Sequence, residues 1–201
     1  MTKLERLAAG AIATTAIGAI ALQSMINEGS ALIAFAMLFR FFTIWSNFAA
    51  GLAMGWVALG RRLPDHVSFA LTSALAVVAL VYHALLAPDH HPVGLDWWTN
   101  LAFHTVVPAS TISWWLMTAR FDTHAWSALP FAMVAPVIYT CFALVYGAAS
   151  GFYPYFFLDR SELGWPQLLL NIAGLSLFFL LIGAAMMGLR ALAARLVTSP
   201  A

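Results

Sequence analysis

Residues 67–87, VSFALTSALAVVALVYHALLA, form an apolar segment that contains no Asp, Glu, Lys or Arg. A helix needs about 20 predominantly apolar residues to cross the hydrocarbon core of a bilayer. The segment is also too long and too uninterrupted to be a strand of an ordinary sheet. It therefore predicts a transmembrane helix, and it sets the fold class of the chain.

Five further segments share this length and hydrophobicity. They lie at residues 5–25, 32–59, 97–118, 127–149 and 166–189. The connections between the segments are mostly short and rich in Gly, Pro, Asn and Asp, which are turn residues. We therefore predict an all-α, polytopic membrane protein with six transmembrane helices in a single domain, residues 1–201.

The composition supports this class and excludes others. Of 201 residues, 63% are hydrophobic and only 8% are charged, whereas a soluble domain carries roughly a quarter charged residues. The formal net charge of +1 gives no reason to expect a nucleic-acid partner. Cys141 is the single cysteine, so the sequence contains neither a disulfide framework nor a cysteine-based metal site.

Basic residues predict the orientation, because Lys and Arg are enriched in cytoplasmic loops. Seven of the nine Lys and Arg residues fall on one side of the six predicted helices. They are Lys3, Arg6, Arg61, Arg62, Arg120, Arg190 and Arg195, while Glu28, Asp89, Asp96, Asp159 and Glu162 fall on the other side. We therefore expect both termini in the cytoplasm and a location in a bacterial-type inner membrane.

Polar residues inside the apolar segments fall mostly in the half of the bilayer that faces away from the cytoplasm. Such groups are costly in hydrocarbon unless they face a partner or a water-filled cavity. The set consists of Arg40, Thr43, Asn47, His83, Asn100, His104, Tyr146 and Asn171. We expect a polar pocket in the outer half, lined by the second, third, fourth and sixth helices.

Thr43 and His104 are the candidate catalytic pair in this set. A threonine nucleophile needs a base to accept its proton, and an imidazole from a neighbouring helix can serve. The alternative for Thr43 is a hydroxyl that bonds the carbonyl of Phe39 within its own helix. Asn47 or Asn100 can then donate hydrogen bonds to an oxyanion.

Other roles for the polar residues stay open. His83 can orient His104, or the two histidines can be axial ligands of a haem, so a haem- or quinone-binding protein is an alternative class. Arg40 can extend to lipid headgroups or bind a carboxylate. Asp89, His90 and His91 are better explained as a solvated turn than as a zinc site. A small transporter or a non-catalytic lipid-binding protein is a further possibility.

Three motifs resemble the bacterial branch of the FAR-17a/androgen-induced-protein-like membrane family. They are FFTIWSN at 41–47, NLAFHTVVP at 100–108 and YPYFFLD at 153–159, and the resemblance covers nearly the whole chain. Animal members are six-transmembrane threonine hydrolases of fatty acid esters of hydroxy fatty acids. The resemblance places their catalytic threonine on Thr43 and their histidine on His104.

The resemblance implies a lipid ester hydrolase whose partner is a membrane lipid or fatty-acid ester, and which needs no cofactor or metal. One feature departs from the family pattern. The segment STISWWLM at 110–117 lacks the acidic residue that we expect before the tryptophan. We therefore do not expect a carboxylate to orient the histidine.

Overall fold

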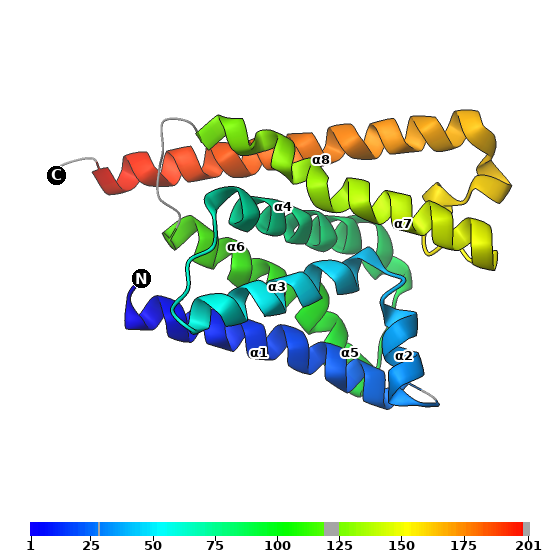
Figure 1. Cartoon of the computed structure of the whole chain (residues 1–201), viewed down its shortest axis with the longest axis horizontal. Helices are drawn as coiled ribbons and strands as arrows, with labels where there is room; N and C mark the ends of the chain where they lie inside the picture. The colour runs from blue at the N-terminus through cyan, green and yellow to red at the C-terminus, as the bar shows by residue number, and fades with distance from the viewer. Residues whose placement is uncertain (28, 119–124, 199–201) are drawn as a thin grey trace.

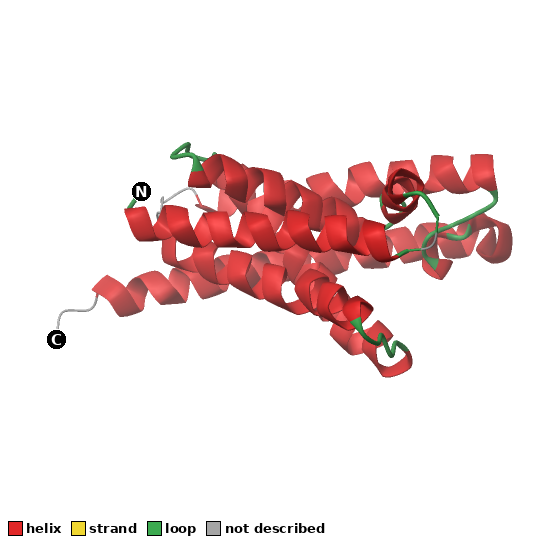
Figure 2. Ribbon diagram, turned by 90° about the horizontal axis from the view of Figure 1, so that it is seen from below, coloured by secondary structure: helices red, strands yellow, loops and turns green. Residues whose placement is uncertain are grey.

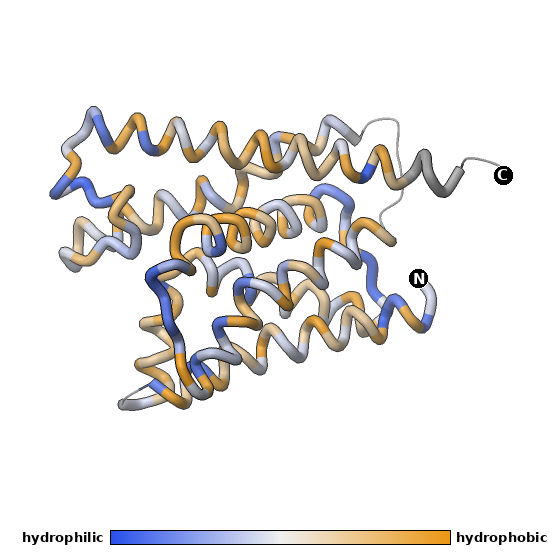
Figure 3. Tube along the Cα trace, turned by 180° about the vertical axis from the view of Figure 1, so that it is seen from behind, coloured by the Kyte–Doolittle hydropathy of each residue, from blue (hydrophilic) through white to orange (hydrophobic). Residues whose placement is uncertain are grey.

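The computed structural model describes residues 1–27, 29–118 and 125–198, and within these residues the chain is all-helical, with no strand (Figure 2). This confirms the predicted all-α class. Arg120 and Glu28, which contributed to the predicted orientation, lie outside the described residues. Figure 3 shows that hydrophobic residues predominate along the helices, whereas hydrophilic residues are concentrated in connections such as the one after α4.

The helical elements follow one another with short connections. They are α1 (Lys3–Ile26), α2 (Ala31–Leu38), α3 (Phe42–Ala58), α4 (Asp65–Val81), η1 (Tyr82–Leu86), η2 (Ala87–Asp89), α5 (Leu95–Leu101), η3 (Ala102–Val106), α6 (Val107–Thr118), η4 (Ala125–Met133), α7 (Val134–Ser150), η5 (Phe156–Leu158) and α8 (Arg160–Thr198). The start of α1 and the end of α8 lie at the same end of the bundle (Figure 1). We call this the terminal end and the opposite one the distal end.

Within the described residues, four helices are long and apolar enough to cross a membrane, namely Lys3–Ile26, Asp65–Asp89, Trp126–Ser150 and Arg160–Ala193. The pair α2 and α3 adds a fifth if both parts belong to one span. Large apolar side chains such as Leu170, Leu177 and Leu181 of α8 are exposed, as expected for a helix that contacts lipid. The remaining predicted segment, 97–118, is helical from Leu95 to Thr118 but is not among these apolar spans.

Close packing of α1 against α3 forms the core near the terminal end. Ala9 and Ala16 of α1 and Ala50 of α3 are completely buried. Small residues allow helix backbones to approach closely in a membrane. At Gly51 the approach is so close that an added Cβ would lie 2.5 Å from the Cδ1 atom of Ile17.

The predicted helix at 32–59 is not continuous, so that prediction was wrong in this respect. The chain breaks between Leu38 and Phe42, and α2 is bent by 104° relative to α3. Two side chains form hydrogen bonds with the backbone at this break. The Nε1 of Trp45 donates to the carbonyl of Phe39 (2.6 Å), and the hydroxyl of Tyr139 in α7 donates to the carbonyl of Arg40 (2.6 Å). These bonds satisfy carbonyl groups that the missing helical turn would have satisfied.

Two π turns, η1 and η3, interrupt the next two helices. In each turn the N–H of the following residue bonds a carbonyl five residues earlier, Ala87 to Tyr82 and Val107 to Ala102. A proline comes next in both cases, and proline has no N–H to continue the ordinary helical pattern. The helix therefore forms a π turn just before each proline, a feature that is frequent at functional sites.

Candidate active site

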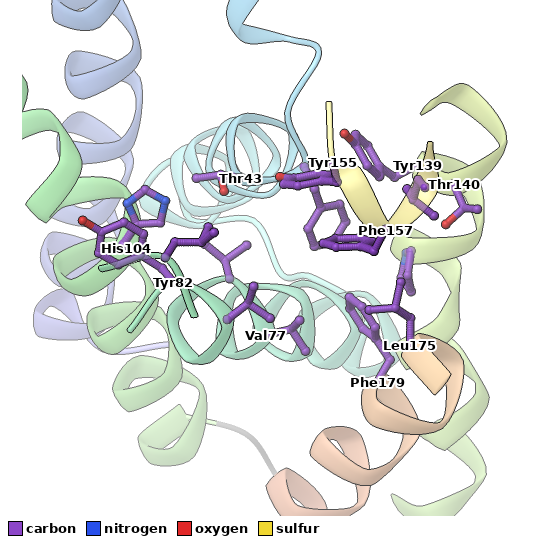
Figure 4. A pocket seen from close by; sticks show the side chains of 16 residues that line it. Thr43, Val77, Tyr82, His104, Tyr139, Thr140, Tyr155, Phe157, Leu175 and Phe179 are labelled. Atoms are coloured by element: carbon purple, nitrogen blue, oxygen red, sulfur yellow. The ribbon is translucent and has the colours of Figure 1, made fainter. Parts of the chain in front are cut away.

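A mostly apolar cavity lies between α3, α4 with η1, η3, α7, the connection before α8, and α8 itself (Figure 4). Its volume is about 70 Å³. Val77, Leu175 and Phe179 are among its apolar lining residues. Six of the lining residues carry a polar group, and these are Thr43, Tyr82, His104, Tyr139, Thr140 and Tyr155.

Both members of the candidate catalytic pair line this cavity, although they come from different helices. Thr43 is the second residue of α3, and His104 lies in η3. Figure 4 places Thr43 between His104 on one side and Tyr155 on the other. Within the described residues, the structure contains no hydrogen bond that joins Thr43 directly to His104.

Thr43 owes its position to the break before α3. A helical threonine hydroxyl ordinarily bonds the carbonyl four residues earlier, which for Thr43 is that of Phe39. Because α3 begins at Phe42, Phe39 lies outside this helix. Trp45 donates to that carbonyl instead. Among the described residues, no hydrogen bond joins the Thr43 hydroxyl to the carbonyl of Phe39. The hydroxyl lies in the first turn of α3, where backbone N–H groups have no helical acceptor.

The phenol of Tyr155 meets Thr43 at this helix start. Burial raises the pKa of Tyr155 above its ordinary value, while hydrogen bonds from the Thr43 side chain and from the backbone N–H groups of Phe42 and Thr43 act in the opposite direction. The phenol is therefore neutral, and its oxygen lies beside both the hydroxyl and the N–H of Thr43. Figure 4 shows the Tyr155 oxygen directed toward Thr43.

The imidazole of His104 is oriented by backbone and aromatic contacts. Its Nδ1 lies 3.1 Å from the carbonyl oxygen of Asn100. A carbonyl only accepts, so Nδ1 carries the proton and Nε2 keeps a lone pair that can accept one. The ring also stacks on Tyr82, with centroids 3.8 Å apart and planes 14° apart. A backbone carbonyl thus orients the histidine without a carboxylate.

Tyr82 is itself fixed by two polar contacts. The Nδ2 of Asn100 donates to its hydroxyl (2.6 Å), so that hydroxyl can donate in turn to the Nδ1 of His90, 3.2 Å away. Asn100 therefore holds His104 through its carbonyl and Tyr82 through its amide. It positions the two rings but does not line the cavity itself.

Asn47 also acts outside the cavity. Its side chain is completely buried, and its Nδ2 donates to the carbonyls of Thr43 (2.8 Å) and Phe103 (3.1 Å). It therefore links α3 to η3, the two elements that carry the candidate pair. Arg40 lies in the break between α2 and α3, and so outside the helix that carries Thr43 and Asn47.

The other predicted pocket residues also lie outside the lining of the cavity. Arg40 places its guanidinium 4.4 Å from the centroid of the Phe152 ring. The exposed His83 pairs its Nε2 with the hydroxyl of Thr105 (3.0 Å), so the two histidines do not share one cavity as haem ligands would. Tyr146 stacks on Phe142, and Asn171 donates to the carbonyl of Phe157 (3.0 Å).

Sequence reasoning missed four polar residues that line the cavity, Tyr82, Tyr139, Thr140 and Tyr155. The motif YPYFFLD contains Tyr155 and was the signal for it in the sequence, but the motif served only to support the family resemblance. Among the described residues, no group of three His, Cys, Asp or Glu side chains is arranged to hold a metal ion.

No protein-family model, curated protein or solved structure matches this chain. The case for a function therefore rests on the cavity and on the side chains that meet there.

Proposed function

We propose that the protein is a membrane-embedded hydrolase of lipid esters, with Thr43 as the nucleophile and His104 as the base. The observation that carries the proposal is that these two residues, from separate helices, line one largely apolar cavity. His104 presents an Nε2 with a free lone pair, because Nδ1 is committed to the carbonyl of Asn100. An apolar cavity with a few convergent polar groups suits an acyl chain that carries one reactive ester.

The reaction has two halves. The Oγ of Thr43 attacks the ester carbonyl carbon while its proton passes to the Nε2 of His104. The C–O bond to the alcohol then breaks, and His104 returns the proton to the departing alkoxide oxygen. Water, deprotonated by His104, attacks the resulting acyl-threonine, and collapse releases the fatty acid and restores the Thr43 hydroxyl. This chemistry needs no metal and no cofactor.

We assign six membrane crossings to the chain, including the helix Leu95–Thr118, with both termini in the cytoplasm of a bacterial-type inner membrane. The distribution of Lys and Arg supports this orientation. The cavity then lies in the outer half of the bilayer. Acyl chains reach it laterally from the lipid, and water reaches it from the outer surface.

Arg40 indicates a second chemical feature of the proposed substrate. Its Nε donates to the carbonyl of Met37 (3.0 Å), and its guanidinium lies against Phe152 near the break before α3. A guanidinium at headgroup level binds a carboxylate by two parallel hydrogen bonds. We therefore propose fatty acid esters that retain a free carboxylate, the class to which esters of hydroxy fatty acids belong.

One experiment tests the catalytic role. Purified wild-type protein in lipid or detergent is expected to release fatty acid from a branched fatty-acid ester, and Thr43→Ala to lose this activity. Thr72→Ala is the matched control, because Thr72 is a buried helical threonine whose hydroxyl bonds the carbonyl of Ser68 away from the cavity. Equal turnover by wild type and Thr43→Ala would remove the mechanism.

A second candidate is a non-catalytic lipid-binding role. The position of Tyr155 favours it, because the phenol oxygen is directed toward Thr43 in the cavity that both residues line. In that case none of the three proteins would hydrolyse the ester, and the purified protein would still retain lipid after extraction.

A further inference from the structure

The segment between α7 and α8 presents Tyr155 to the start of α3. The side chains of Tyr155 and Thr43 line the same cavity, and Figure 4 shows the phenol oxygen of Tyr155 directed toward Thr43 at the start of α3. The phenol therefore occupies the position from which an incoming ester would have to approach Thr43. We call residues 151–159 the aromatic loop.

Contacts on both sides of Tyr155 hold the aromatic loop in place. Tyr153 packs so closely on Gly147 of α7 that an added Cβ there would overlap with its ring. On the other side, Asn171 of α8 donates to the carbonyl of Phe157 (3.0 Å). Tyr155 and Phe157 stack with centroids 5.1 Å apart and planes 8° apart. The loop is thus seated between α7 and α8, with Tyr155 directed inward.

The cavity in this arrangement is small. A volume of about 70 Å³ holds only about five to seven waters, at roughly 10–15 Å³ for each. An ester with a fatty acyl chain needs several times that space. The Tyr155 side chain forms part of the cavity wall beside Thr43 and is the group that blocks the hydroxyl directly.

We propose that Tyr155 is the gate of the site. The aromatic loop must move Tyr155 away before an ester reaches Thr43, and the ester carbonyl oxygen then takes the place of the phenol oxygen. There it faces the backbone N–H groups of Phe42 and Thr43, which lie at the positive end of α3 and stabilise negative charge on that oxygen. The proposal rests on the proposed function in taking Thr43 as the reacting group.

Accessibility of position 43 tests the gate without requiring hydrolysis. In a Cys141→Ala background, which removes the single native cysteine, Thr43→Cys is labelled with a small membrane-permeant methanethiosulfonate reagent. Adding Tyr155→Phe is expected to speed labelling about two- to tenfold, the population shift produced when the phenol hydroxyl loses its polar contacts with the start of α3. Gly147→Ala is expected to speed labelling as well, because the new Cβ displaces Tyr153 and unseats the loop.

Two variants control for general loosening of the protein. Tyr153→Phe removes a phenol hydroxyl from the same loop, and Gly174→Ala adds a methyl group on α8 where nothing lies within 4 Å. Both are expected to leave the labelling rate unchanged. An unchanged or slower rate with Tyr155→Phe would overturn the gate.

Hydrolysis measured in parallel separates the two proposals. With Thr43 intact, Tyr155→Phe is expected to raise kcat/KM in the same proportion as the labelling rate. If labelling accelerates while no variant hydrolyses an ester, the gate stands and the proposed function fails. If hydrolysis depends on Thr43 but labelling does not respond to Tyr155→Phe, the function stands and the gate fails.

Discussion

The terminal and distal ends of the bundle differ in the regularity of their helices. Near the terminal end α1 and α3 pack through small residues, with Ala9 and Ala50 completely buried. At the distal end the break before α3, the π turns η1 and η3, and the non-helical Gly164 (φ 67°) interrupt the helices. Regular helices satisfy their own backbone groups, whereas each interruption leaves carbonyls and N–H groups that need other partners.

Most of the polar side chains at the distal end meet that need. Trp45 and Tyr139 donate to carbonyls in the break, and Asn47 and Asn171 donate to the carbonyls of Phe103 and Phe157. A polar residue inside an apolar segment is thus more often a partner for the backbone than a reacting group. Among the described residues, neither the Thr43 hydroxyl nor the Nε2 of His104 has a hydrogen bond to the backbone, and the proposed function assigns the chemistry to these two groups.

Removing the imidazole of His104 at the distal end is expected to change the rate of ester hydrolysis far more than removing a histidine at the terminal end. We expect His104→Ala to lower the rate of ester hydrolysis about 10²- to 10⁴-fold, because the general base is lost. The comparison variant is His66→Ala, because His66 lies in the first turn of α4 at the terminal end and contacts Phe131. Its rate should match wild type. A similar loss in both variants would break the distinction between the ends.

Gly51→Ala tests the close packing near the terminal end. The added Cβ would meet the Cδ1 of Ile17 at 2.5 Å, so we expect a loss of about 1–3 kcal/mol in the free energy of unfolding. Gly18→Ala, where nothing lies within 4 Å, should leave stability unchanged or slightly higher. Unfolding of the detergent-solubilised protein measures both. Equal stability of the two variants would contradict the packing described for α1 and α3.

Asn47→Ala tests whether polar side chains at the distal end act as backbone partners. Its loss leaves the carbonyls of Thr43 and Phe103 without their side-chain donor, so we expect destabilisation by about 1–2 kcal/mol. The neighbouring Ser46→Ala removes a buried hydroxyl that has no partner, and should cost nothing measurable. Thermal unfolding of both variants separates these outcomes, and an equal cost for the two would remove the assigned role of Asn47.

The smallest expected effect concerns pH and the start of α8. The hydroxyl of Ser161 holds the pKa of Asp159 below its ordinary value, and the carboxylate also accepts the N–H of Ser161 (2.9 Å). Because the folded pKa lies below the unfolded one, the stabilisation is present above about pH 4 and is lost as pH falls through the folded value. Amide protection at Ser161 and Glu162 should decline in that window. Asp159→Asn should abolish this decline. If the pH dependence of amide protection were the same in wild type and Asp159→Asn, the assigned role of the Asp159 carboxylate at the start of α8 would be contradicted.

Hydrophobic length predicted the elements well, because a long apolar segment has few alternatives to a helix. It placed helices over 5–25, 67–87 and 166–189, near α1, α4 with η1, and α8. It missed the 104° break at 39–41, since residues 32–59 are apolar throughout apart from Arg40 and a few polar side chains. The break depends on Tyr139, which lies about a hundred positions later in the chain.

The sequence by itself determined that the chain is all-helical, that its segments are long enough to cross a membrane, and that Thr43 and His104 are candidates. Only the tertiary structure decided that these two line one cavity, that Asn100 and Tyr82 orient the imidazole, and that Tyr155 meets Thr43. The physical reason is that helix formation depends on neighbours within one turn. The direction in which a side chain points relative to another helix depends on packing between distant segments.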